Sequence, residues 1–569
     1  MRFIAFACDY DETLASHGRV SSDGVAALKR LASSGRKLVL VTGRELDDLL
    51  GIFPEADVFD RIVAENGALV HRPASREKTL LGERPPRQFV DALIDRGVSP
   101  LSVGEVIVAT TEPNQGVVLS TIRDLGLELQ VIFNKGSVMV LPSGINKGTG
   151  LSRALRELGL SAHNCVAIGD AENDHAFLSI SECSAAVSNA LPTLKERADI
   201  VTLRESTAGV IKLIDQLLSD DLRGYEGRLS RHDILFGEDE RGQPVFLRSY
   251  GTTLLIAGAS GAGKSTTAIA LIERIVEREY QCCLIDPEGD YAGFERAVVL
   301  GSSNRAPVLD EILQVLDNRD SNCVVNMVGV PSDDRSPFFA ALLARLQELR
   351  ARTGRPHWIA IDEAHHLLPS AWGAAPVALP KELPNTIFMT LEPRQLSAEV
   401  LSSVNEVIAV GPSAHSAVEQ LGSALEVSLP PLAPPTLERA EVLLWRFRRR
   451  EPPMRVRVAA PRSDQRRHRR KYAEGELKED RSFYFKGPQG KLNLRAQNLI
   501  IFNQIAQGVD DATWLYHLRR GEYSRWFREE IKDEDLASEA ADIERNANSS
   551  AVETRQRMRQ AIERRYTIP

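Results

Sequence analysis

The stretch FIAFACDYDET, residues 3–13, joins an apolar run directly to two carboxylates, Asp9 and Asp11. An apolar run of this length that ends in polar residues is typical of a buried strand in a parallel sheet. Ligand sites of α/β sheets form at the carboxyl ends of such strands, so both carboxylates would project into one. The stretch therefore predicts an α/β domain with an acidic site at one edge of its sheet.

Three more polar clusters stand at strand or helix ends farther along the chain. Thr42-Gly43-Arg44 follows the strand KLVL, Asn146-Lys147-Gly148 opens a helix, and the segment GDAEND (169–174) follows the strand CVAI. Asp and Asn are ordinary turn residues. Independent turns nevertheless rarely produce four such clusters in a fixed order, so a single active site is the better interpretation.

In this order the clusters resemble the haloacid dehalogenase superfamily of phosphohydrolases. AENG (64–67) is similar to its large-cap subclass, which includes Cof-like proteins and phosphoglycolate phosphatases. The resemblance implies a Rossmann-like α/β domain over residues 1–222, with an α/β cap at about 83–142. It also implies a small-molecule phosphate ester as substrate, without indicating which one.

The same resemblance implies a role for each matching residue. Asp9 would attack phosphorus and form an aspartyl-phosphate, while Asp11 would protonate the leaving oxygen and then activate water. Mg²⁺ would be held by the all-oxygen set of Asp9, the Asp11 backbone carbonyl and Asp170. The residues expected to hold the substrate phosphate are Thr42, Gly43, Lys147 and Asn173. Glu12 departs from the pattern, which commonly has Gly there, so we expect altered activity or substrate choice.

A second motif, GASGAGKS at 258–265, follows the apolar strand TLLIA and precedes the helical run TTAIALIERIVE. This is the context that a P-loop requires, with backbone N–H groups and a lysine around the phosphates of ATP. Asp362 and Glu363 follow the strand HWIAI and would supply a second contact to Mg²⁺ and the catalytic base for water. The residues expected to bind ATP or its Mg²⁺ are Gly258, Gly261, Gly263, Lys264, Ser265, Thr266 and Asp362. Ser265 would be the metal ligand.

Together with DPEGDY (286–291) and LSAEVLSSVNEVIAVG, this motif resembles the HerA/FtsK-like ATPases over about 233–460. The resemblance implies a RecA-like core, a homo-oligomer that is most often a hexamer, and in many members the movement of DNA. Leu391 follows Thr390 where that family commonly has a polar sensor residue, which disfavours coupled translocation. Arg394 fits either an arginine finger or a solvated loop residue. His365 and His366 read as helix residues rather than zinc ligands.

Two segments near the C-terminus have an unusual composition. Nine aromatic residues between 483 and 527 fit either a small core or a base-stacking surface, and helical periodicity favours the core. Residues 472–569 are therefore interpreted as a small, mainly helical accessory domain. The segment 446–471 carries a net charge of +10, and a solvated strand face is favoured over nucleic-acid binding.

The overall composition is that of a globular protein with several cores. The chain has 569 residues, 43% hydrophobic and 26% charged, and at ~100–200 residues per domain this predicts about three to four domains. No stretch approaches the ~18 apolar residues of a membrane helix, and the six cysteines lack metal-ligand spacing. We expect a soluble, cytoplasmic protein with reduced thiols and no membrane partner.

Three functions fit these motifs. The favoured one is a phosphatase whose nucleotide module assembles or regulates it. A nucleic-acid motor whose phosphatase acts on nucleotides or strand ends is the first alternative, and a bifunctional polynucleotide kinase and phosphatase is the second. Glu363 beside Asp362 favours an ATPase over a kinase, and the large cap favours small substrates over DNA ends.

Overall fold

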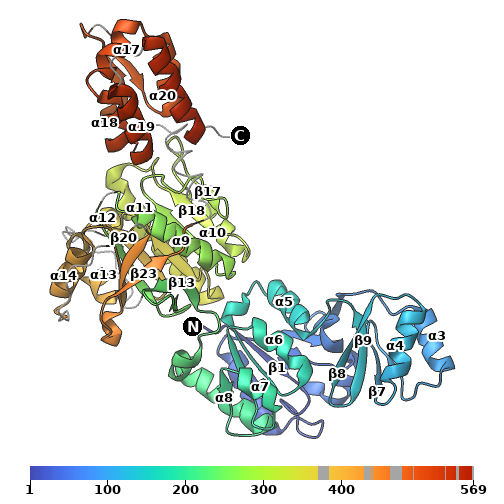
Figure 1. Cartoon of the computed structure of the whole chain (residues 1–569). Helices are drawn as coiled ribbons and strands as arrows, with labels where there is room; N and C mark the ends of the chain where they lie inside the picture. Colours follow the sequence, from blue (N-terminus) through green and yellow to red (C-terminus); the bar gives the residue numbers. More distant parts are fainter. Residues whose placement is uncertain are drawn as a thin grey trace.

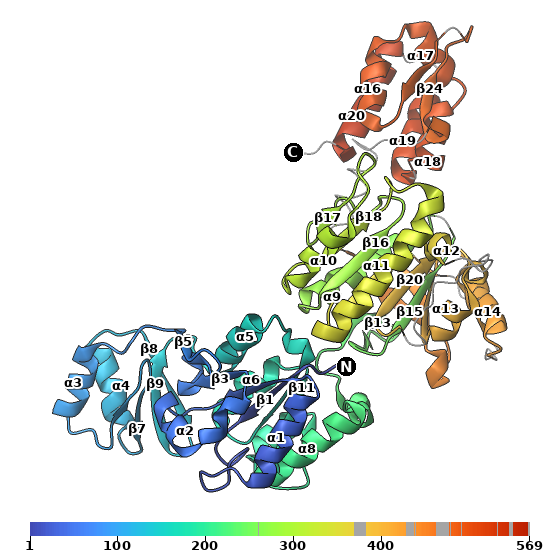
Figure 2. The ribbon, with the colours of Figure 1, turned by 180° about the vertical axis from the view of Figure 1, so that it is seen from behind.

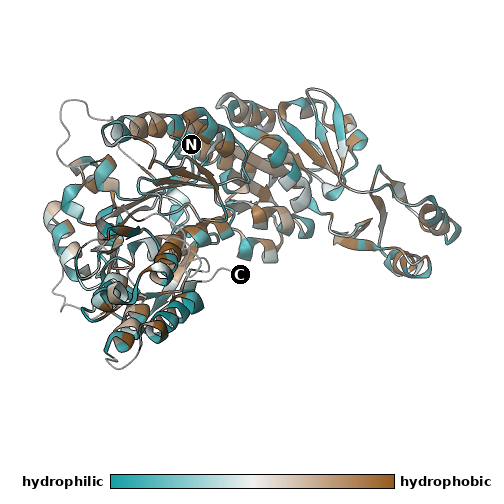
Figure 3. Ribbon diagram, turned by 90° about the horizontal axis from the view of Figure 1, so that it is seen from above, coloured by the Kyte–Doolittle hydropathy of each residue, from teal (hydrophilic) through white to brown (hydrophobic). Residues whose placement is uncertain are grey.

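The computed structural model describes residues 1–259, 261–368, 383–427, 437–438, 440–461, 477, 479–490, 492–531, 533–545 and 550–566. Within these ranges the chain forms two large α/β units and a smaller, mainly helical unit (Figure 1). Apolar residues lie along the central strands and on the helix faces turned toward them (Figure 3). The α/β class predicted from the alternating pattern is confirmed.

The first unit is built on an eight-stranded sheet of order β12-β11-β10-β1-β2-β3-β4-β5. Its first six strands run parallel, and β4 and β5 pair antiparallel at one edge. The strands are β1 (Ala5–Asp9), β2 (Lys37–Val41), β3 (Arg61–Ala64), β4 (Leu69–Arg72), β5 (Glu77–Leu80), β10 (Cys165–Gly169), β11 (Cys183–Ala186) and β12 (Ile200–Val201). The helices are α1 (Ser22–Ser33), α2 (Leu46–Ile52), α5 (Lys147–Glu157), α6 (His175–Ile180), α7 (Pro192–Arg197) and α8 (Ser206–Asp220).

A separate four-stranded sheet of order β6-β7-β9-β8 is inserted between β5 and α5. It is antiparallel and carries two helices, and together they enclose a small apolar core of their own. Its elements are α3 (Arg87–Asp95), β6 (Ser102–Val103), β7 (Val108–Thr111), α4 (Gln115–Asp124), β8 (Leu129–Asn134) and β9 (Ser137–Pro142). They lie in the segment for which a cap is predicted.

The second unit contains an eleven-stranded sheet of order β14-β13-β23-β22-β21-β15-β20-β19-β16-β18-β17 (Figure 2). The strands from β21 to β17 are parallel, and the remaining four extend the sheet antiparallel. The strands are β13 (Ile234–Asp239), β14 (Pro244–Leu247), β15 (Thr253–Ala257), β16 (Cys282–Asp286), β17 (Val298–Leu300), β18 (Cys323–Asn326), β19 (Trp358–Ile361), β20 (Thr386–Thr390), β21 (Glu406–Val410), β22 (Glu441–Trp445) and β23 (Met454–Val458). The helices are α9 (Lys264–Glu277), α10 (Leu309–Asp317), α11 (Ser332–Thr353), α12 (Ala364–Leu367), α13 (Ala398–Ser403) and α14 (Ala414–Ala424).

The third unit packs five helices around the hairpin β24 (Phe483–Phe485) and β25 (Leu494–Ala496). The helices are α16 (Leu499–Gly508), α17 (Asp511–Leu518), α18 (Glu522–Glu529), α19 (Glu534–Arg545) and α20 (Ala551–Tyr566). Seven of the nine clustered aromatic residues lie in its core, and Trp514 and Tyr523 stack with ring centroids 4.5 Å apart. The prediction that these aromatic residues pack a core, rather than a base-binding surface, is confirmed for those seven.

The described part of the basic segment, residues 446–461, covers β23 and the turn that joins it to β22. Arg446 and Arg449 pair with Glu406, Arg455 pairs with Glu240, and Arg457 pairs with Glu438 and Glu441. These arginines therefore already contact carboxylates, as a solvated strand face would. Residues 462–471 of the segment lie outside the described residues.

Two findings bear on the chain's environment. All six cysteines are buried and none forms a disulfide. Among the described helices, none combines the length and apolarity that a membrane crossing needs.

The two α/β units dock through the amino ends of their parallel strands. In the first unit the contacts come from Asn164 and Glu182, which directly precede β10 and β11. In the second they come from Tyr280 and His357, which precede β16 and β19. His357 Nε2 lies 3.1 Å from Asn164 Oδ1, and the Tyr280 hydroxyl donates to Glu182 over 2.8 Å. The carboxyl ends of both sheets, where α/β sheets bind ligands, consequently face away from this contact.

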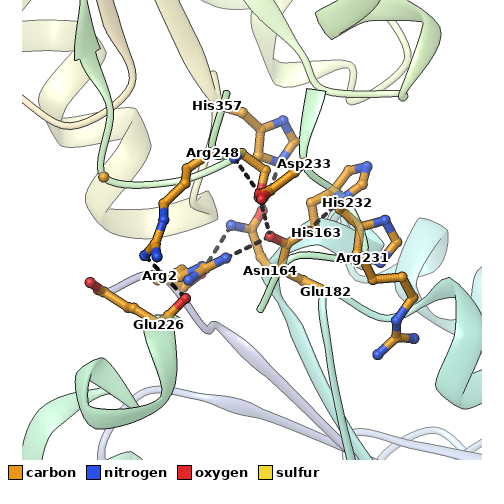
Figure 4. A network of polar contacts seen from close by, with 12 residues as sticks. Arg2, His163, Asn164, Glu182, Glu226, Arg231, His232, Asp233, Arg248 and His357 are labelled. Carbon is orange, nitrogen blue, oxygen red and sulfur yellow. Dashed lines mark hydrogen bonds and ion pairs between the residues drawn. The ribbon is translucent and has the colours of Figure 1, made fainter. Parts of the chain in front are cut away.

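Glu182 is the centre of this contact (Figure 4). Its carboxylate accepts hydrogen bonds from Arg2 over 2.6 Å and from the hydroxyl of Ser249 over 3.0 Å, besides Tyr280. His163 Nδ1 lies 2.8 Å from the same carboxylate, and its Nε2 lies 2.7 Å from the Arg278 carbonyl in the other unit. Both ring nitrogens of His163 thus face oxygen atoms, one in each α/β unit. A buried carboxylate therefore contacts Arg2, His163, Ser249 and Tyr280 at the junction.

Candidate functional site

The sequence-predicted carboxylates converge at the carboxyl edge of the first sheet. Asp9 is the last residue of β1, Asp170 directly follows β10, and Asp174 lies in the single 3₁₀ turn η4 (Glu172–Asp174) just beyond it. Lys147, the first residue of α5, places its Nζ 2.5 Å from Asp9 Oδ1 and 2.5 Å from Asp174 Oδ1. All four side chains are buried. Strand and helix ends distant in sequence therefore form one compact charged cluster.

The charges of this cluster do not balance. Burial raises the pKa of Asp9, and repulsion from Asp174 raises it further. Burial lowers the pKa of Lys147, but the charges of Asp174 and Asp9 outweigh that effect and the net direction is upward. The three carboxylates outnumber the buried ammonium group of Lys147, so the cluster has an excess of negative charge that a bound cation would relieve.

The same carboxylates fit a divalent metal. One oxygen from each of Asp9, Asp170 and Asp174 lies within 4.8 Å of the other two, and an all-carboxylate donor set suits a hard cation such as Mg²⁺. Asp174 Oδ2 accepts the backbone N–H groups of Asp170 and Ala171 at 2.8 and 2.9 Å. Asp174 therefore shapes the loop that carries Asp170, and Asp9 and Asp170 are the residues that would hold the metal.

Thr42 and Asp11 are joined through an arginine. Thr42 lies one residue beyond β2, is buried, and accepts the Arg44 backbone N–H over 3.1 Å. The Arg44 guanidinium binds Asp11 with both arms of its fork, at 2.7 Å to Oδ1 and 2.9 Å to Oδ2. The structure therefore directs the Asp11 side chain to Arg44 rather than into the carboxylate cluster. The sequence motif Thr42-Gly43-Arg44 predicts a role for Thr42 and Gly43 only. The contact of Arg44 with Asp11 is an addition from the structure.

A third contact lies at the same sheet edge, among residues expected to hold the substrate phosphate. The amide of Asn173 donates to Asn66 Oδ1 over 2.9 Å, and both residues are buried. A Cβ built on Gly43 would lie 3.6 Å from Asn173 Nδ2, so the Gly43 loop and Asn173 face one another. Gly67 has φ +105°, and a Cβ there would lie 1.9 Å from the Asn146 carbonyl oxygen. Only glycine allows AENG to pack against the turn that presents Lys147.

The second candidate site lies at the carboxyl edge of the other sheet. The P-loop connects β15 to α9, with Gly261 and Gly263 at φ +76° and +100°, conformations that favour glycine. Lys264 Nζ donates to the Gly258 carbonyl over 2.9 Å. Ser265 and Thr266 lie in the first turn of α9, where backbone N–H groups lack helical partners. The loop thus has the form of a phosphate cradle.

The acidic pair follows β19 and faces the P-loop lysine. Burial, reinforced by Asp286, raises the pKa of Asp362 to about 8. Burial also raises the pKa of Glu363, and the charge of Lys264 opposes that rise. His365 Nδ1 lies 3.4 Å from Glu363 Oε2 and 3.3 Å from the Thr390 hydroxyl. His365 is a helix residue, as expected, but it also links Glu363 to the end of β20.

Comparison with known proteins finds a family model for each of the two α/β units. Residues 6–99 and 103–214 match the family model of haloacid dehalogenase-like hydrolases, and residues 247–410 match that of an AAA domain. Phosphoglycolate phosphatase 2 of Saccharolobus solfataricus is 33% identical over 38% of this chain and 93% of its own length. The chain belongs to the haloacid dehalogenase-like hydrolases. The phosphoglycolate phosphatase of Methanothermobacter thermautotrophicus is 28% identical over 38% of this chain and 98% of its own length.

This hydrolase is an enzyme of the phosphatase type with a second, AAA-type P-loop site. Its Glu12, where the family commonly has Gly, adopts φ 56° and so occupies the left-handed conformation that glycine favours. The Glu12 side chain accepts the His17 backbone N–H over 3.2 Å, and its carbonyl accepts from Asn189 and Ser206. These local bonds hold the strained turn in place.

Proposed function

We propose that this hydrolase cleaves small phosphate monoesters through an aspartyl-phosphate in the presence of Mg²⁺, and that its substrate class is that of phosphoglycolate. The contact that carries the proposal is Lys147 bridging Asp9 and Asp174 beside Asp170, four buried charged groups at one sheet edge. The relatives named phosphoglycolate phosphatase support the choice of ester.

The chain's own residues account for each step. Asp9 attacks phosphorus, with Lys147 holding both this carboxylate and a phosphoryl oxygen. Thr42 and the Gly43 backbone receive the remaining phosphoryl oxygens, and Asn173 fixes their loop. Once Arg44 releases the Asp11 side chain, Asp11 donates a proton to the leaving oxygen and then takes one from water. A bound Mg²⁺ would supply charge neutralisation between the carboxylate and the phosphate dianion.

Metal removal tests this proposal. The purified full chain is expected to hydrolyse phosphoglycolate with Mg²⁺, to lose that activity with EDTA, and to regain it when Mg²⁺ is restored, because the acidic cluster otherwise repels the dianion. Released phosphate is the readout. Absence of hydrolysis of phosphoglycolate and of p-nitrophenyl phosphate with Mg²⁺ present would contradict the proposed activity.

We further propose that the second unit binds and hydrolyses ATP with Mg²⁺ as a RecA-like module of the HerA type, in a homo-oligomer that is a hexamer. Its role would be to assemble or regulate the phosphatase. The P-loop, the Asp362–Glu363 pair and their position at one sheet edge support ATP hydrolysis. Direct transfer between the sites is disfavoured, because the two edges face away from the shared junction.

Two substitutions separate ATP binding from ATP hydrolysis. Lys264→Ala is expected to weaken ATP binding at least tenfold, since Lys264 would contact the phosphates, whereas Glu363→Gln should keep binding and lose turnover by about 10²-fold or more. Calorimetry measures the first effect and phosphate release measures the second. Glu348→Gln, on the exposed face of α11, is the matched control. Unchanged affinity in Lys264→Ala would contradict the phosphate-cradle interpretation.

A further inference from the structure

The cap reaches the catalytic carboxylates through the tip of one hairpin. Strands β8 and β9 are joined by the two-residue turn Lys135-Gly136, with φ 48° and 81°. Positive φ at both positions is typical of a type I′ turn, in which Asn, Asp or Gly is favoured first. A lysine there costs conformational energy that those residues would avoid. Backbone strain of this kind often accompanies a functional role of the side chain.

The Lys135 side chain extends from the turn into the active site. Its Nζ lies 2.5 Å from Asp170 Oδ2, and β8 packs against η4, the turn that follows Asp170. Asp170 is buried, whereas 42% of the Lys135 side chain is exposed. One end of this ion pair is thus buried in the sheet domain, and the other is a partly exposed residue of the cap hairpin.

The ion pair occupies an oxygen that the metal would use. Asp170 Oδ1 accepts the Thr13 hydroxyl over 3.1 Å and Oδ2 accepts Lys135, so both oxygens of the carboxylate that would hold a divalent cation already have a partner. An ammonium group and Mg²⁺ repel one another at short distance, so a metal on Asp170 would weaken the contact of this carboxylate with Lys135. Metal loading would therefore favour release of the Lys135 ammonium group next to the carboxylate cluster.

The cap lies close to the Gly43 loop. Met139 of β9 is buried, and its sulfur would lie 3.7 Å from a Cβ built on Gly43, the residue expected to contact the phosphate. The cap thus closes directly over the phosphate-binding loop. A short leaving group would place its far end near the lysine, where a charge-assisted hydrogen bond selects an anion.

We propose that Lys135 determines specificity by binding a carboxylate on the leaving group of the phosphate ester. The inference rests on the proposed phosphatase function and names the chemical class of its substrate: a short phosphorylated carboxylic acid. In the absence of metal, the Asp170 carboxylate takes the place of the substrate's carboxylate at this ammonium group.

Paired esters test the proposal. Phosphoglycolate is compared with ethyl phosphate, which replaces the carboxylate by a methyl group. In Lys135→Met, kcat/KM for phosphoglycolate is expected to fall by about 10- to 100-fold, mainly through KM, the range for a lost hydrogen bond between charged groups. The value for ethyl phosphate should stay within about twofold. Lys135→Arg should retain most of the preference, and Lys29→Met, on the exposed face of α1, should leave both esters unchanged.

A calorimetric titration with Mg²⁺ alone supplies a readout independent of activity. Lys135→Met should bind Mg²⁺ several-fold more tightly than the wild type, because the competing ammonium group is gone. Unchanged Mg²⁺ affinity, or an equal loss of kcat/KM on both esters, would overturn the role of Lys135 and leave phosphatase activity standing. A wild-type chain inactive on both esters would overturn the proposed function itself.

Discussion

Asp9→Asn is expected to abolish phosphate-ester hydrolysis, with kcat reduced by about 10⁴- to 10⁶-fold, the loss that accompanies removal of a catalytic nucleophile. The amide cannot attack phosphorus, so no aspartyl-phosphate forms. The fold should persist, and its melting temperature should not fall. Burial and like charge raise the pKa of Asp9, and a neutral side chain removes that repulsion. Steady-state phosphate release and a thermal melt measure the two effects.

The control for this variant is Asp57→Asn, an exposed carboxylate in the same unit, which should keep full activity. Asp9→Asn should also keep its ATPase rate, because the P-loop lies on the other sheet. Turnover of phosphoglycolate by Asp9→Asn near the wild-type rate would show that another group attacks phosphorus.

Glu182→Leu is expected to destabilise the chain by about 3–5 kcal/mol, the cost of leaving buried charges unpaired. The buried carboxylate pairs with Arg2 and His163 at 2.6 and 2.8 Å. Burial acts to raise the pKa of Glu182, but the charges of His163 and Arg2 outweigh it and the pKa lies well below its usual range. Its loss would leave the buried Arg2 guanidinium without its carboxylate partner at the junction of the α/β units.

Scanning calorimetry of the full chain measures this effect as a lower temperature for the transition of the two α/β units. The matched control is Asp215→Asn, which breaks an exposed pair with Arg30 and should cost less than about 1 kcal/mol. Equal shifts for the two variants would show that the Glu182 contacts do not contribute to stability beyond an ordinary surface pair.

Much of the fold and the candidate site could be predicted from sequence because the signals are local. The apolar runs before Asp9 and Asp170 define strands, and a polar residue at a strand end already has its position at the sheet edge. The P-loop could be predicted for the same reason, since its glycines and Lys264 lie within eight consecutive residues, 258–265. Each of these predictions needed only one strand, one turn and one helix.

Contacts between distant segments could not be predicted in the same way. Lys135 lies in a cap hairpin, and its contact with Asp170 depends on how the cap closes over the core domain. The ion pair between Arg44 and Asp11 depends on how the neighbouring strands β1 and β2 place the two residues. No sequence motif indicates the role of Glu182, because its partners come from four separate segments of the chain. In each case tertiary packing, not local pattern, sets the partner.

The docking of two sheets by their amino ends limits how the two halves of the chain could influence one another. Both candidate sites lie at sheet edges that face away from the junction of the two α/β units, so a compound released at one site would diffuse away before it met the other. Neither α/β unit covers the candidate site of the other. Any signal from nucleotide to phosphatase would have to travel as a mechanical displacement, along β16 or β19, across Glu182 and Asn164, and up β11 or β10 to Asp170.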